Sequence, residues 1–223
     1  VQMLITHQKA FDFLLKIEQL RFQTRWNQTP RVPATSVLGH SYFVAVMTLL
    51  LGREINVKMC DRRVINNFFS ALFHDLPEAV TRDIISPVKQ ATDDLPFIVK
   101  KIEDEIVNKE LVPLMEPFFK DELIFYTSDE FSDRVLCKNG VMVKVSFEDL
   151  NTKYNSDDFN PVDGRLVRVS DHLSALMEAD ISIRHGITSE HLQSGREGML
   201  HLYKDDEIIS GINVNKLFQT ICK

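Results

Sequence analysis

A short polar cluster follows an apolar stretch in the sequence "SALFHDLPEAVTRD", residues 70–83. His74 and Asp75 are adjacent there, and Glu78 comes soon after them. The apolar run before His74 predicts a helix that is buried on most sides, and ionisable groups at a buried helix end need a partner or a cation. Imidazole and carboxylate together suit a divalent metal ion. Taken alone, however, a His-Asp pair fits a capping or hydrogen-bonding role better than a metal site.

Two more polar residues lie near the starts of apolar helical segments. His40 is in "SVLGHSYFVAVMTLLL" and Asp171 is in "LVRVSDHLSALMEA". Each alone is typical of a satisfied core or capping residue. Taken with His74 and Asp75, they predict three helices whose apolar faces converge on two imidazoles and two carboxylates.

Such a mixed set of nitrogen and oxygen ligands suits manganese, cobalt, iron, nickel or zinc. Four protein ligands on an octahedral ion leave positions open for water and substrate, as a catalytic site requires. No His lies between Asp75 and Asp171. The four residues form one site, so we expect one divalent metal ion there.

Helical periodicity dominates the elements that must position these groups. An amphipathic helix is predicted over 3–23, because Phe11, Leu14, Leu15 and Phe22 fall on one stripe. Further helices are predicted over 37–54, 61–75, 94–116 and 163–186, with one or two more over 190–220.

Local signals indicate where some of these helices begin. Ser36 and Asp61 are suited to be N-caps of the helices that follow them. Pro77 cannot continue a helix but suits a first turn, which predicts a short new helix from that residue.

One segment departs from the helical pattern. The stretch "RVLCKNGVMVKVSF" has an Asn-Gly pair between two β-prone arms, which predicts a small β-hairpin near 133–147. No linker or internal repeat divides the chain. We therefore expect a single domain over 1–223 with a helical body.

Composition limits the classes of function. The chain has 223 residues, of which 44% are hydrophobic, and a net charge of −6. These values predict one globular domain and argue against a nucleic-acid partner, although a small phosphorylated ligand stays compatible with them. Three scattered Cys favour reduced thiols and a cytoplasmic location, and no apolar run reaches the ~20 residues that a membrane span needs. The chain begins at Val1, so it is either trimmed or a piece of a longer protein, and the sequence does not say which.

The order His40, then His74 with Asp75, then Asp171 resembles the H…HD…D signature of the HD-domain phosphohydrolase superfamily. The likeness covers residues 7–185 and implies an all-α fold, a helical bundle with the small β-hairpin as an insertion. The HD core would span 7–186, and 187–223 would be a C-terminal helical extension without a catalytic role.

Further residues make the chain most similar to the bacterial HD-domain 5′-deoxynucleotidases. Arg25 and Trp26 form the Arg-Trp pair in the loop after the first helix, Glu78 stands four residues after the HD His, and Asp83 stands nine residues after it, before "IISPVK". The resemblance implies roles for them. Arg25 would bind phosphate oxygens, and Trp26 would form a wall beside a base or sugar. Glu78 would transfer a proton.

Structural alternatives stay open for each of these residues. Glu78 also fits a first-turn Glu favoured by the helix dipole, and a buried Trp26 could anchor the loop with Arg25 in solvent. Asp83 would accept hydrogen bonds from sugar hydroxyls. Ser86 and Lys89 are nearby candidates for substrate contact, although Lys89 also fits a solvated surface residue.

The resemblance implies a metal-dependent phosphomonoesterase that releases phosphate from (deoxy)nucleoside 5′-monophosphates. The alternative is a nucleotide-binding, non-catalytic HD module within a longer protein. No membrane partner is expected. The resemblance also allows a homodimer, although no stripe in the sequence identifies an interface.

Overall fold

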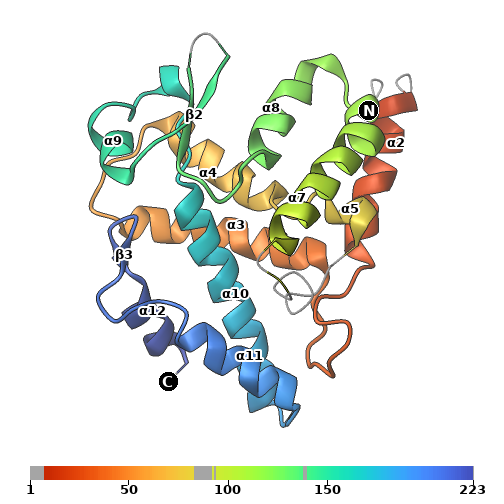
Figure 1. Cartoon of the computed structure of the whole chain (residues 1–223), viewed down its shortest axis with the longest axis vertical. Helices are drawn as coiled ribbons and strands as arrows, with labels where there is room; N and C mark the ends of the chain where they lie inside the picture. Colours follow the sequence, from red (N-terminus) through yellow and green to blue (C-terminus); the bar gives the residue numbers. More distant parts are fainter. Residues whose placement is uncertain (1–7, 83–91, 93, 138–139, 223) are drawn as a thin grey trace.

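The computed structural model describes residues 8–82, 92, 94–137 and 140–222, and it is a helical bundle with two small β-hairpins (Figure 1). The α-helices are α2 Gln8–Glu18, α3 Val37–Glu54, α4 Asp61–Phe73, α5 Glu78–Thr81, α7 Leu95–Ile106, α8 Pro117–Thr127, α9 Phe147–Thr152, α10 Gly164–Arg184, α11 Glu190–Leu200 and α12 Val214–Ile221. The predicted all-α class with a small β insertion is confirmed. No described helix is long and apolar enough to cross a membrane.

Helices α3, α4 and α10 form the centre of the bundle. Helix α3 packs against both α4 and α10, and Val44, Ala45, Ala71 and Val167 are fully buried where the three meet. In Figure 1, α2 and the N-terminus lie at the opposite end of the molecule from α11, α12 and the C-terminus. His40 and Asp171 lie on these central helices, and His74 and Asp75 directly follow α4.

Two helix starts show why local signals succeed or fail. Ser36 caps α3 as predicted, because its hydroxyl accepts a hydrogen bond from Gly39 N at 3.0 Å. The prediction of Asp61 as N-cap of α4 is wrong, because the cap is Cys60 and Asp61 is the first helical residue. The exposed N–H groups of α4 are instead satisfied by side chains from a distant loop, with Asn155 Oδ1 accepting from Cys60 N and Asp157 Oδ1 from Arg62 N.

Helix α2 is amphipathic, but its buried face differs from the predicted stripe. The four residues of that stripe are exposed by 47, 45, 45 and 69%: Phe11, Leu14, Leu15 and Phe22. The buried side carries Ala10 and Phe13, followed by Leu20 in the next turn, Gln19–Arg21. The predicted stripe and the observed buried residues both have helical spacing. Which face of α2 is buried depends on the elements that pack against it, which include α5 and the turn Val112–Leu114.

The segment 94–116 is not the single long helix that was predicted. Helix α7 ends at Ile106, and a π-helical turn Val107–Leu111 and a 3₁₀ turn Val112–Leu114 follow it. Pro113 disfavours a regular α-helix through these turns, because proline lacks an N–H and its ring clashes with the carbonyl four residues earlier. Pro77 acts as predicted, since it is the N-cap of the short helix α5.

The hairpin predicted near 133–147 is present. Strand β1, Arg134–Leu136, pairs antiparallel with β2, Met142–Lys144. A second hairpin, β3 Ile208–Ile209 with β4 Ile212–Asn213, was missed, because 190–220 was expected to hold helices alone. Its turn is Ser210-Gly211, and both residues have positive φ, as two-residue hairpin turns favour.

Candidate metal centre

The structure brings the four predicted metal ligands together at the junction of three helices. His40 lies in the first turn of α3, His74 and Asp75 directly follow α4, and Asp171 lies on α10. His40 Nε2 is 3.0 Å from Asp171 Oδ1 and 3.7 Å from Asp75 Oδ2. His74 Nε2 is 3.2 Å from Asp75 Oδ2 and 3.8 Å from Asp171 Oδ1. Each imidazole therefore faces both carboxylates.

The other nitrogen of each ring fixes this orientation. His74 Nδ1 is 2.7 Å from the carbonyl oxygen of Ala71, which can only accept, so Nδ1 carries the hydrogen. His40 Nδ1 lies 3.0 Å from Ser174 Oγ and 3.4 Å from Glu178 Oε1. Such contacts behind an imidazole set its tautomer and leave Nε2 as the atom available to a metal ion.

These residues fit a divalent cation. His74 Nε2 is buried and makes no hydrogen bond within the described part of the chain. The ligand atoms of His40, His74 and Asp75 all lie within 4.8 Å of one another. Two ligand atoms about 2.1 Å from one ion are at most about 4.2 Å apart, so only a small closure is needed. The geometry agrees with one ion held by His40, His74 and Asp75, and Asp171 lies outside this group of three although it contacts both imidazoles.

The charges of the cluster also favour the binding of a cation. Burial opposes the charged form of His74, yet Asp75 and Asp171 raise its pKa well above the usual value of 6.5. Burial would likewise raise the pKa of Asp75, but His74, then His40 and Arg25, hold it well below its usual range. Two ionised carboxylates thus require positive charge between them. A bound metal ion would supply that charge, and its binding would release the imidazole proton.

Arg25 stands beside the metal centre. Its Nη1 is 3.4 Å from Asp75 Oδ2, and its Nε is 3.4 Å from Glu178 Oε2. Burial would lower the pKa of this guanidinium, but Glu178 and Asp75 raise it above its usual range. Arg25 is therefore a fixed positive charge and not a solvent-facing side chain.

A comparison of the sequence with known protein families identifies the family of this chain. Residues 17–199 match the family described as the HD domain. The chain belongs to the HD-domain family.

Solved structures share the fold at low sequence identity. A structure described as an HD-domain phosphohydrolase from Listeria innocua is 17% identical, with a TM-score of 0.65 over 94% of this chain and 85% of that one. A Pyrococcus horikoshii protein is 20% identical, with a TM-score of 0.56 over 95% of both chains. A conserved hypothetical protein from Pyrococcus furiosus is 18% identical, with a TM-score of 0.55 over 95% and 98%. A comparison with curated proteins found no match.

Glu178 is a site residue of this HD domain that the sequence analysis missed. Its carboxylate is buried and accepts hydrogen bonds from Trp26 Nε1 and Arg31 Nη1, both at 3.0 Å, in addition to its contacts with Arg25 and His40. Burial opposes ionisation, but His40 and the two arginines lower the pKa of Glu178 to about 2. One carboxylate therefore connects the Arg-Trp loop to a metal-centre imidazole.

A signal for Glu178 was present in the sequence. It lies seven residues after Asp171 on α10, which places both residues on one face of the helix. A carboxylate two turns from a predicted metal ligand on an apolar face could have been included in the predicted site.

Trp26 is held in place by contacts within the protein. Its indole N–H donates to Glu178, and its backbone has a φ of 56°, which a non-glycine residue adopts at a cost. A Cβ on Gly195 of α11 would lie 3.0 Å from the indole Cη2 atom. Helix α11 therefore contacts the loop of the site; it falls in the predicted C-terminal extension 187–223, although the HD-domain match runs to residue 199. Stacking of Trp26 on a base or sugar stays a prediction.

The remaining predicted residues differ in what the structure describes. Glu78 is buried at the first residue of α5, and its negative charge contributes to the raised pKa of Arg25. Its backbone carbonyl accepts a hydrogen bond from Gln23 Nε2 at 2.8 Å. Asp83, Ser86 and Lys89 lie outside the described residues.

Proposed function

We propose that this HD domain is a metal-dependent phosphohydrolase that releases phosphate from (deoxy)nucleoside 5′-monophosphates. The carrying observation is the convergence of two Nε2 atoms and two carboxylates beside the buried guanidinium of Arg25. The similar structure from Listeria innocua is described as an HD-domain phosphohydrolase, which supports this class of reaction.

A divalent ion bound by His40, His74, Asp75 and Asp171 would act as a Lewis acid that favours attack by water near neutral pH and offsets the charge of a phosphate. Arg25 holds a permanent charge next to this position. Its fork-shaped guanidinium suits phosphate oxygens and stabilises the charge that develops on them.

The reaction consumes one water and forms a bond from the water oxygen to phosphorus, while the bond from phosphorus to the 5′-oxygen breaks. The leaving 5′-oxygen needs a proton. We assign this transfer to Glu78, buried near Arg25 and four residues after His74: its carboxylate would accept a proton as the water attacks and then donate it to the 5′-oxygen. The products are inorganic phosphate and a nucleoside.

The proposal is tested by phosphate release from a panel of ribo- and deoxyribonucleoside monophosphates with manganese- or cobalt-loaded protein. We expect release with at least one nucleotide and its loss in Asp75→Ala. The exposed Asp206 provides a matched control, and Asp206→Ala should leave release unchanged. No release with any ion or nucleotide would contradict the proposal. Tight nucleotide binding without release would instead identify a non-catalytic binding module.

A further inference from the structure

The outer face of α3 is apolar and exposed along most of the helix. Residues 37–52 contain no Asp, Glu, Lys or Arg, although 26% of the chain is charged. A helix that is apolar on all sides is normally buried on all sides. Here α3 packs against α4 and α10, yet Tyr42, Phe43 and Leu50 are exposed by 61, 39 and 60%. The described residues therefore leave one face of this helix uncovered.

The exposed side chains of α3 form one continuous stripe. At 3.6 residues per turn, five of them fall on the same side of the helix: Tyr42, Phe43, Val46, Leu49 and Leu50. Val46 and Leu49 are partly exposed, and they lie between the three exposed residues. We call this set the outer stripe. The run 37–52 is apolar on both its exposed and its buried side, so the sequence alone did not reveal the stripe.

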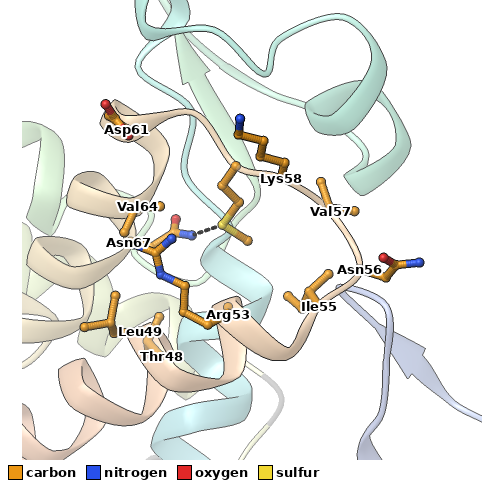
Figure 2. A pocket seen from close by; sticks show the side chains of 12 residues that line it. Thr48, Leu49, Arg53, Ile55, Asn56, Val57, Lys58, Asp61, Val64 and Asn67 are labelled. Carbon is orange, nitrogen blue, oxygen red and sulfur yellow. Dashed lines mark hydrogen bonds between the residues drawn. The ribbon is translucent and has the colours of Figure 1, made fainter.

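Charged residues mark one end of the outer stripe. Arg53 and Glu54 are exposed and are the first residues of α3 with a permanent charge. Figure 2 shows Leu49 and Arg53 on α3, beside a cavity of about 380 Å³ between the end of this helix and the start of α4. An apolar centre with charges at its edge has the composition of a protein interface, whose core is depleted of charge and whose rim is polar.

Other exposed apolar side chains lie among charges. Those of α2 have Lys16 and Glu18 as neighbours on the helix, and those of α7 have Lys100 and Lys101. Scattered exposed apolar residues need no partner, whereas a contiguous apolar patch marks an interaction site. Within the described part of the chain, the outer stripe is the surface that best fits a protein interface.

The area of the outer stripe limits the strength of such an interface. An aromatic side chain presents about 150–250 Å², so the exposed fractions leave roughly 200 Å² on Tyr42 and Phe43 together. With Val46 and the leucines the stripe offers roughly 400 Å², a size at which surface patches are often functional. Two such stripes with their polar rims would bury about 1,200 Å², the lower limit for a specific interface.

A second copy of this chain fits the outer stripe. The net charge of −6 makes two copies repel one another, but the stripe itself adds no charge to that repulsion. In a symmetric dimer, positions on either side of the two-fold axis meet one another. An axis through Val46 would place Leu50 against the partner's Tyr42. It would also place Gly39, which has no side chain, opposite the long side chain of the partner's Arg53.

We propose that the outer stripe is the interface of a homodimer, in which two copies of α3 run in opposite directions across an axis at Val46. The dimer does not depend on the proposed hydrolase activity.

Association is measured by sedimentation velocity, and the small area predicts a dimer at about 100 µM protein that dissociates on dilution toward about 1 µM. Leu50→Glu should weaken the dimer by about ten-fold or more, because it buries an unpaired charge against the partner's Tyr42. Leu50 is exposed, so this variant should fold as the wild type does, which circular dichroism checks. Phe118→Glu is the matched control, since Phe118 of α8 is 63% exposed and lies outside the stripe. It should leave the dimer unchanged.

Val46→Cys tests the position of the axis. A residue on the axis meets its own copy, within the Cα separation of about 7 Å that a disulfide allows. Arg53 is farther along α3, which places its two copies roughly 21 Å apart, so Arg53→Cys should not form a link. Oxidation followed by mass spectrometry identifies the linked peptides, and the wild type, with its own free cysteines, gives the background.

Three results would overturn the proposal. The first is a protein that stays monomeric at about 100 µM, which is well above the dissociation constant of a specific interface. The second is a Leu50→Glu variant that dimerises as well as Phe118→Glu and the wild type. The third is a disulfide in Arg53→Cys without one in Val46→Cys.

Discussion

Glu178 contacts four other residues around the candidate metal centre. One buried carboxylate accepts hydrogen bonds from Trp26 and Arg31, and lies 3.4 Å from both Arg25 Nε and His40 Nδ1. Removing its charge would leave buried cations without compensation, which costs more than the loss of one hydrogen bond. Glu178 is therefore suited to position both Arg25, which we propose binds phosphate, and His40, a predicted metal ligand.

Glu178→Gln should lower phosphate release by about 10- to 100-fold, as is usual for residues that orient metal ligands. Elemental analysis and circular dichroism would show whether metal and fold are retained. Asp180→Asn is the control, because Asp180 lies on the same helix but pairs with Arg184 and Arg196. Equal activity of Glu178→Gln and wild type would show that the charge is dispensable.

The proximity of the four predicted metal ligands could be predicted from the sequence, because each lies beside an apolar helical pattern. Glu178 is equally polar and lies on the same helix as Asp171, but its partners are about 150 positions away in the Arg-Trp loop. No pattern in the sequence around Glu178 indicates a contact with residues so far away along the chain. The role of a residue is predictable when its neighbours along the chain define it, and not when distant ones do.

At the scale of elements, the same distinction explains which helices were predicted well. Helix α3 has the predicted bounds because its cap, Ser36, is local. The start of α4 was assigned the wrong cap because its first N–H groups donate to Asn155 and Asp157, which lie more than 90 residues later in the chain. The Asn-Gly turn between its strands predicted the hairpin β1–β2. The buried face of α2 depends instead on the elements that pack against it.

Helix α11 gives an element-scale prediction, since it contacts Trp26 of the site. In Gly195→Ala the new Cβ would lie 3.0 Å from the indole, so Trp26 must move by a few tenths of an ångström. We expect phosphate release to fall several-fold, because Trp26 neighbours Arg25 and shares Glu178 with it. Steady-state kinetics and metal content would be measured together.

Gly198→Ala is the matched control on α11, since nothing lies within 4 Å of its added Cβ. It should stabilise the protein by about 1 kcal/mol through helix propensity and leave activity unchanged. If both Gly195→Ala and Gly198→Ala keep full activity, helix α11 does not position Trp26.

At the scale of the whole molecule, a buried ion pair joins α4, which His74 and Asp75 follow, to the start of α10, which carries Asp171. Arg63 of α4 donates to both oxygens of Asp163, the residue before α10, at 2.7 and 2.6 Å, and both side chains are fully buried. Asn67 also donates to Asp163 at 2.7 Å. This brace fixes how α4 and α10 cross, and therefore where His74 meets Asp171.

Asp133 borders this brace and gives the molecule a pH-dependent stability. Its carboxylate is 5% exposed and accepts a hydrogen bond from Arg165 N at 3.0 Å. Burial, with a contribution from Asp163, raises its pKa from 3.8 to about 6, while Arg165 and Arg63 oppose that rise. The folded state therefore binds this proton more tightly than the unfolded state. The contribution of Asp133 to stability is full below pH 4 and is lost as the pH rises to 6.

Asp133→Asn should remove that loss, because an amide oxygen still accepts from Arg165 N but never ionises. Relative to wild type, we expect the variant to gain on the order of 2 kcal/mol between pH 4 and pH 7. Urea unfolding in EDTA at several pH values measures the difference, and EDTA removes the influence of bound metal. The exposed Asp206→Asn should show no such trend. A difference between Asp133→Asn and wild type that stays constant with pH, or that falls, would mean that Asp133 titrates normally in the folded protein.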